Sequence, residues 1–132
     1  MLMASLLMLV APGPVWVAAG GGPGGVPVEI DRSSLTWRNL QRVAWRMRLG
    51  EARLDGTAEE RHLDLVDCGA GLTAVMETVS LDSGGRVLNV QRDGEGLAMQ
   101  RLSPATPGTV GETVAERACL LRPPPPPPRR KR

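Results

Sequence analysis

The stretch from Leu40 to Leu49 alternates between apolar and charged side chains, and a period of two sustained over eight residues is typical of a β-strand. One face carries apolar side chains, those of Val43, Trp45, Met47 and Leu49. The other face carries three arginines, Arg42, Arg46 and Arg48. We expect the apolar face to lie in the core. The arginine face is compatible with an anionic ligand, but a solvated face with carboxylate partners on neighbouring strands is the stronger interpretation.

Shorter β-favouring runs on both sides of this strand extend the same architecture. They cover residues 15–18, 26–31, 61–68, 72–81 and 86–92, with residues 97–102 as a candidate last strand. Turn-forming sequences follow several of the strands, at Asp55-Gly56, Asp82 to Gly85 and Asp93 to Gly96. Pro27 cannot donate a hydrogen bond to a neighbouring strand, which places its run at a sheet edge or at a strand start. The short spacing predicts an antiparallel meander of about six strands.

The pattern changes after Pro107. Thr109 and Glu112 have the Thr-x-x-Glu spacing of a capping box, in which the hydroxyl and the carboxylate satisfy free amides of a first helical turn. Apolar side chains then recur at helical spacing, at Val110, Val114, Ala118 and Leu121. One helix is therefore expected after the sheet, which gives an α+β fold.

The N-terminal residues 1–11 are all apolar or small, and this run ends at Pro12-Gly13-Pro14. The run is too short to span a bilayer, which needs about 20 residues, but it suits the apolar core of a secretory signal. The basic residues that usually open a signal are missing, since the first charge is Glu29. We interpret residues 1–13 as a secretory signal whose start codon is assigned too late, with a buried apolar strand as the alternative. Export to the periplasm, the cell surface or the medium follows.

The two cysteines, Cys68 and Cys119, lie far apart in the sequence. A small exported domain is expected to pair them, because its compartment is oxidising and so small a core needs a covalent cross-link. Closing a loop of about 50 residues is worth roughly 4 kcal/mol in the chain-entropy model. A reactive thiol is the alternative, although neither cysteine belongs to a Cys-x-x-Cys pair. The disulfide would tie the C-terminal helix to the sheet.

The positive charge of the chain is concentrated at its C-terminus. Five of the sixteen basic residues lie beyond Leu121, namely Arg122, Arg129, Arg130, Lys131 and Arg132. Without those five, 11 basic residues face 14 acidic ones, a net charge of −3, so a nucleic-acid groove is not expected. Six prolines at 123–128 favour a polyproline II spacer that carries the basic tip roughly 20 Å from the helix. Residues 122–132 are expected to form a disordered tail, which is either solvated or in contact with an anionic polymer.

One strand carries the residues that most resemble an active site. His62, Asp64 and Cys68 share a face of it, and a cysteine nucleophile with a histidine base is a known arrangement. Six residues of strand separate His62 from Cys68, however, a span of about 20 Å that is far beyond hydrogen-bond reach. His62 is the only histidine, and no glycine-rich loop precedes a helix as a phosphate site requires. The sequence predicts no catalytic, cofactor or metal site.

Four sequence elements carry a family resemblance. They are Trp16 at the start of a short strand, the run Val28 to Leu35, Val43-Ala44-Trp45, and Asp67-Cys68 together with Pro107 to Glu112 and Ala118-Cys119. This ensemble resembles the surface-adhesin protein E family of exported bacterial proteins over residues 15–121. The resemblance implies a curved antiparallel sheet with a C-terminal helix docked by the disulfide. For the namesake of the family it implies adhesion to host matrix and serum proteins such as vitronectin, laminin and plasminogen.

Two functions follow as expectations. The first is a non-enzymatic exported domain of the surface-adhesin E type, residues 14–121, that binds a protein or an anionic polymer at the cell envelope or outside the cell. The second is a periplasmic structural or interaction protein, with the basic tail as an electrostatic tether. Neither involves nucleic acid or a transmembrane span.

Overall fold

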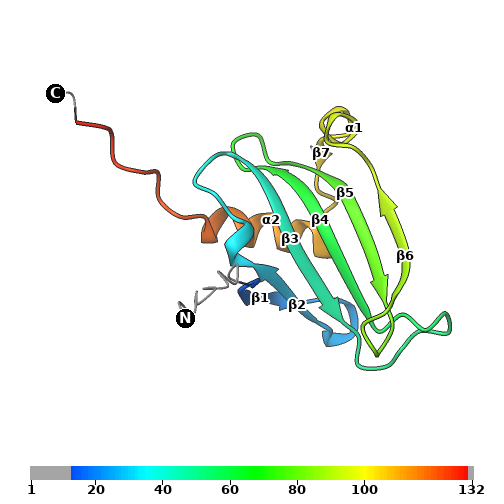
Figure 1. Cartoon of the computed structure of the whole chain (residues 1–132). Helices are drawn as coiled ribbons and strands as arrows, with labels where there is room; N and C mark the ends of the chain where they lie inside the picture. The colour runs from blue at the N-terminus through cyan, green and yellow to red at the C-terminus, as the bar shows by residue number, and fades with distance from the viewer. Residues whose placement is uncertain (1–12, 131–132) are drawn as a thin grey trace, which may run out of the picture.

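The computed structural model describes residues 13–130, so residues 1–12 of the predicted signal lie outside the described residues. Six strands follow one another along the chain: β1 (Trp16–Gly21), β2 (Pro27–Asp31), β3 (Leu40–Arg48), β4 (Glu59–Asp67), β5 (Leu72–Leu81) and β6 (Val87–Arg92). Each pairs with the next in antiparallel fashion, so the order in the sheet is the order in the sequence (Figure 1). The predicted meander is confirmed.

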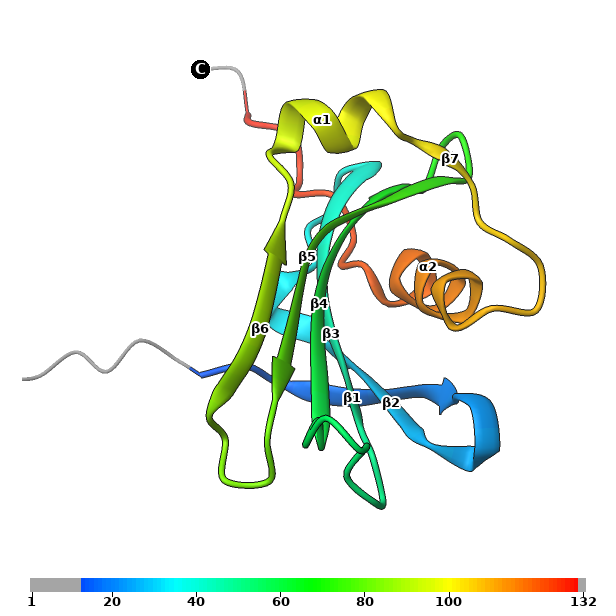
Figure 2. The ribbon, with the colours of Figure 1, turned by 90° about the vertical axis from the view of Figure 1, so that its right-hand side faces the viewer.

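Helix α2 (Val110–Leu121) is the predicted C-terminal helix, and it lies in the hollow of the curled sheet (Figure 2). Its Val114 and Ala118 are fully buried among apolar residues of the first four strands. The core members from the sheet are Ala19, Val28, Ile30, Val43, Trp45 and Val66. The apolar face of β3 therefore faces the core, as its alternation predicts.

The disulfide between Cys68 and Cys119 is present, with the two Cα atoms 5.6 Å apart. Cys68 follows the last residue of β4, and Cys119 lies in the last turns of α2. The cross-link therefore ties the helix to the sheet, as predicted.

The prediction of a last strand at residues 97–102 is wrong. The chain forms a short helix, α1 (Glu95–Gln100), which begins after an extended Gly94. Ala98 is its buried residue, while Leu97 and Met99 are exposed. Leu, Ala, Met and Gln are all good helix formers, and a run this short does not distinguish a period of two from one of 3.6. The described chain thus has two α-helices where one was expected.

The strand β7 (Ser103–Pro104) follows α1 and pairs with the beginning of β5, at Leu72 and Thr73. Strand β6 pairs with the other end of β5, from Glu77 to Leu81. Both therefore lie on the same side of β5, and α1 makes the connection between them (Figure 2). This arrangement places the segment from Ser103 to Thr109 over the hollow of the sheet, beside α2.

Candidate functional site

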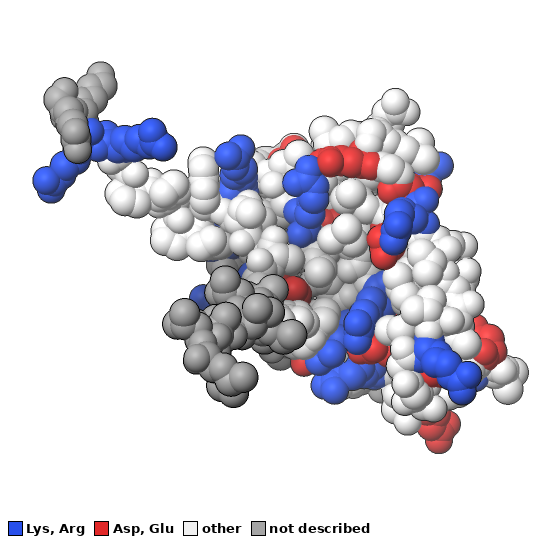
Figure 3. Space-filling model, in the orientation of Figure 1, with Lys and Arg blue, Asp and Glu red and all other residues white. Residues whose placement is uncertain are grey.

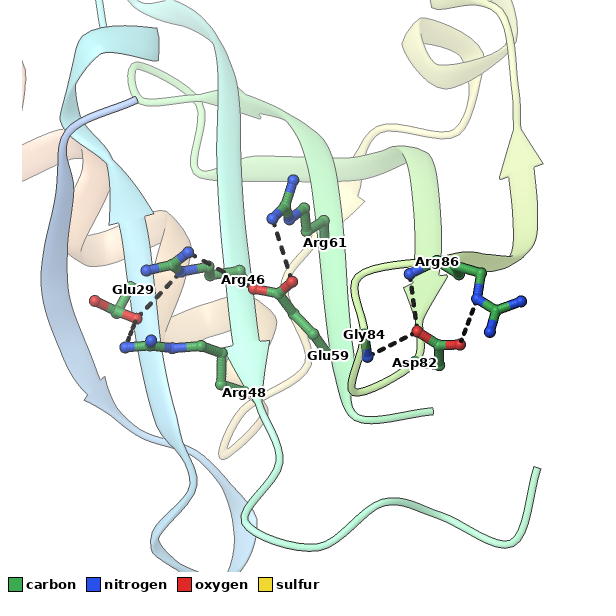
Figure 4. Close-up of polar contacts among 8 residues, drawn as sticks. All are labelled: Glu29, Arg46, Arg48, Glu59, Arg61, Asp82, Gly84 and Arg86. Carbon is green, nitrogen blue, oxygen red and sulfur yellow. Dashed lines mark hydrogen bonds and ion pairs between the residues drawn. The ribbon is translucent and has the colours of Figure 1, made fainter. Parts of the chain in front are cut away.

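The arginine face of β3 is on the opposite side of the sheet from α2, and its charges are largely neutralised by glutamates of the neighbouring strands (Figure 4). Arg46 Nε lies 3.2 Å from Glu29 Oε1 of β2, and Arg46 Nη1 lies 3.6 Å from Glu59 Oε1 of β4. Arg48 Nη2 contacts Glu29 at 3.0 Å, and Arg61 Nη2 contacts Glu59 at 3.3 Å. The predicted cross-strand carboxylate partners are confirmed.

Arg46 departs from the expectation of a fully solvated face, because its side chain is only 14% exposed. The guanidinium carbon lies 4.1 Å from the centroid of the Trp16 ring, an arrangement that gives a cation–π contact. Two carboxylates and one indole thus engage this arginine, and that leaves it poorly suited to an anionic ligand.

An apolar groove lies beside this charged region on the same face of the sheet. It has a volume of about 330 Å³, and its apolar lining consists of Ala44, Leu63, Val79, Leu81 and Val87. Arg61 and Glu77 line it as well. Val90 of β6 is the direct partner of Val79, and Val87 is paired with Leu81, so the apolar strip continues from the groove onto β6.

Strand β6 is at one end of the sheet and, within residues 13–130, pairs only with β5. All six of its residues are exposed, including the apolar side chains of Val87, Leu88 and Val90. Figure 3 shows an uncharged surface over this strand, with charged side chains around it. A free strand edge with exposed apolar side chains is a template on which another chain can add a strand.

The ends of this edge carry charge. Arg92 Nε at the end of β6 lies 2.9 Å from Glu77 Oε2. In the hairpin before β6, Asp82 Oδ1 accepts hydrogen bonds from the backbone N–H groups of Gly84 and Arg86, at 2.9 and 2.8 Å (Figure 4). Charged residues therefore bound the apolar part of the β6 edge at both of its ends.

His62, Asp64 and Cys68, which share a strand face but were not predicted to form an active site, each make separate contacts in the fold. Cys68 is held in the disulfide. The His62 imidazole stacks on the Trp45 indole with ring centroids 4.1 Å apart. Its Nε2 lies 3.3 Å from Glu60 Oε2, and burial lowers the pKa of His62, so the ring is neutral at neutral pH. An imidazole held in this way serves to pack against the core residue Trp45.

Asp64 is a buried acid, and its burial is what the sequence pattern did not predict. Only 5% of this residue is exposed, and its Oδ1 has no hydrogen-bond partner within the described chain. Burial raises the pKa of Asp64 to about 6, and the nearby Trp45 indole N–H lowers that pKa only in part. The distance and angle between the two groups do not meet the criteria for a hydrogen bond, so Trp45 Nε1 has no partner either. The sequence signal for this site was its position, opposite Val43 and in phase with Val66 on the core face of β4.

The capping box is present in a shifted form. Thr109 Oγ1 accepts a hydrogen bond from the Glu112 N–H at 3.3 Å, as predicted. The Glu112 carboxylate accepts from the N–H of Gly108 at 3.2 Å, one residue before the N-cap. The N–H of Thr109 itself donates to the carbonyl of Thr106, which explains the shift.

The basic tail leaves the domain beyond α2, and it forms no helix or strand up to residue 130 (Figure 1). Arg122 is anchored, since its Nη1 donates to Asn39 Oδ1 at 2.8 Å. The prolines from Pro123 on, Arg129 and Arg130 are exposed. Lys131 and Arg132 lie outside the described residues. No tail residue up to residue 130 lines the groove.

In residues 13–130, no three side chains of His, Cys, Asp or Glu come together in a way that could hold a metal ion. Among the helices described, none has the length and apolar character needed to cross a bilayer. Comparison of the chain with family models, with curated proteins and with solved structures finds no significant match.

Proposed function

We propose that this chain is a non-catalytic exported domain that binds another macromolecule at the cell envelope or outside the cell. The observation that carries the proposal is the apolar strip that runs from the groove to the free edge of β6. Exposed apolar patches bounded by charge are typical of protein interaction surfaces. The partner is proposed to be a protein, which would add a strand to β6 and place side chains in the groove.

Export is part of the proposal, and the Cys68–Cys119 disulfide is compatible with an oxidising compartment. The test is the cell fraction and the mature N-terminus of the expressed protein. A cleaved product in the periplasm, at the cell surface or in the medium is expected. An uncleaved cytoplasmic product with free thiols would contradict the proposal.

Within this proposal, the resemblance to the surface-adhesin protein E family favours host matrix and serum proteins as partners. Retention on immobilised vitronectin or laminin is the direct measurement. Val90→Lys places a charge on the free edge and should abolish retention. Val15→Lys is a matched control, because Val15 is 51% exposed and Val90 47% exposed, and Val15 lies away from β6. Equal retention of both variants would exclude β6 as the binding surface.

The alternative function is a periplasmic interaction protein that binds an anionic polymer through its tail. The observation that favours it is the exposed pair Arg129 and Arg130 at the end of the polyproline segment. Binding to heparin or lipopolysaccharide should then disappear when residues 123–132 are deleted, and it should weaken steeply with salt. Binding through β6 should survive that deletion, so the two functions are separated by one variant.

A further inference from the structure

A second cavity lies on the core side of the sheet, away from the groove and the free edge. It has a volume of about 380 Å³ and is formed by β4, β5, the segment around β7 and the beginning of α2. Its polar lining includes Asp64, Thr73, Arg101, Ser103, Thr106 and Thr109. Val75, Pro104 and Ala105 provide apolar contacts. A volume near the lower end of the usual range for ligand sites fits a small molecule.

Asp64 is the unusual group in this lining. Only 5% of this residue is exposed, and its Oδ1 lacks a hydrogen-bond partner in the described part of the chain. A buried polar atom without a partner costs about 1–3 kcal/mol, and such groups in native proteins call for an explanation. Asp64 lines the cavity, and its Oδ1 is closed to solvent, so a bound molecule could donate a hydrogen bond to the other carboxyl oxygen, Oδ2.

The charged groups around Asp64 do not neutralise it. Arg101 is the cation of the cavity, but its Nη1 lies 2.9 Å from Asp93 Oδ2, which also lines the cavity. His62, on the same face of β4, is neutral and stacked on Trp45 of β3. The lining residues from β5, from α2 and from its N-cap, which include Thr73, Gly111 and Thr109, carry no charge. The cavity is thus lined by two acidic residues and one arginine, so a cationic ligand would neutralise its excess negative charge.

We propose that this cavity binds a small organic amine, whose ammonium group donates hydrogen bonds to Asp64. The hydroxyls of Thr73, Ser103 and Thr106 would serve polar substituents, and Val75 would contact a short alkyl chain. A metal ion is disfavoured because the described residues offer no three suitable ligands at one point. A free anion is disfavoured because Asp93 already engages Arg101.

The test is an NMR titration of the full chain with three probes of similar size: n-butylammonium, 1-butanol and butyrate. Saturable shifts of the amides of Thr73, Val75, Ser103 and Thr106 are expected with n-butylammonium. Asp64→Asn should weaken this binding at least about tenfold, the loss typical of a charge-assisted hydrogen bond. Glu51→Gln is the control, because Glu51 is an exposed acid outside the cavity, and it should leave the affinity unchanged.

The pH dependence gives a second readout. The amine requires the ionised carboxylate, so affinity should rise as the pH increases through the pKa of Asp64 and should be flat in Asp64→Asn. Equal binding of 1-butanol, preferential binding of butyrate, unchanged affinity in Asp64→Asn or the absence of saturable shifts would each overturn the proposal. Because these measurements do not involve β6 or the tail, their outcome is independent of the proposed adhesion.

Discussion

The indole ring of Trp45 and the imidazole ring of His62 lie nearly parallel across β3 and β4, with an angle of 8° between their planes. The two residues are direct partners in the sheet register. Their stack covers the core beside Asp64, which lies two residues further along β4. A histidine and a carboxyl group that could suggest general acid–base chemistry are thus built into one packed wall.

Asp64→Asn is expected to stabilise the domain at neutral and higher pH. The pKa of Asp64 is about 6 in the folded chain and 3.8 in its ordinary state, so the folded state binds the proton more tightly. The stability that the protonated carboxyl of Asp64 contributes is fully present below pH 3.8 and is lost as the pH rises through 6. The free energy of unfolding falls by up to about 3 kcal/mol over this range. Urea unfolding should therefore show a gain for the variant near pH 7.5 and little change at acidic pH.

A loss of stability in Asp64→Asn near pH 7.5 would contradict this account. It would mean that the ionised carboxylate is stabilised in the fold, and that its buried oxygen has a partner after all.

His62 should have the opposite dependence on pH. Burial lowers the pKa of His62, so the unfolded chain binds the proton more strongly. Its contribution is present above the unfolded pKa of about 6.5 and is lost as the pH falls through the lower folded value. The test compares Asp64→Asn with the double variant Asp64→Asn and His62→Phe, in which the phenyl ring keeps an aromatic stack. The free energy of unfolding should change less between pH 7 and acidic pH in the double variant than in Asp64→Asn alone. An identical pH dependence in both proteins would show that His62 does not titrate on unfolding.

Loss of the Cys68–Cys119 disulfide should cost about 4 kcal/mol, because the unfolded chain regains the freedom of a long loop. The double variant Cys68→Ala with Cys119→Ala is the sample, and thermal unfolding is the measurement. Intact mass after alkylation of the native protein, with and without reduction, should reveal two protected thiols. Two freely alkylated thiols without reduction would contradict the cross-link.

Thr109→Ala should weaken the start of α2 by about 1 kcal/mol, since Thr109 Oγ1 caps the N–H of Glu112. Thr109→Ser keeps the hydroxyl and serves as the control. Chemical unfolding should place the serine variant close to the parent. Equal losses in both variants would point to the methyl group of Thr109 instead of its hydroxyl.

Gly20→Ala should destabilise the contact between β1 and α2 by about 1–2 kcal/mol. Gly20 has φ +131°, a conformation that side-chain-bearing residues rarely adopt, and an added Cβ would lie 3.2 Å from Thr113 Cγ2. Gly21→Ala is the neighbouring control, because its Cβ would have open space. Thermal unfolding should separate the two, and equal midpoints would contradict the close approach.

Much of the fold could be predicted because its determinants are local. Alternation fixed the faces of β3, short turns such as Asp82 to Gly85 gave the hairpins, and the spacing of Thr109 and Glu112 located the start of α2. The error at α1 has the same origin, since six residues are too few for either period to show. The candidate binding regions were harder to predict from the sequence. The exposure of Val87 and Val90 depends on β6 being the end of the sheet, and no local pattern distinguishes an end strand from a central one.

The sequence by itself determined the antiparallel meander, the C-terminal helix and the pairing of two cysteines, because periodicity, turn chemistry and cysteine count act through the local chain. Only the tertiary structure decided that Arg46 is held between two glutamates, that Trp45 covers His62, and that Asp64 lines a cavity without a hydrogen-bond partner for Oδ1. Those relationships join residues from different strands. They depend on register and curl, which place side chains far apart in sequence within a few ångströms of one another.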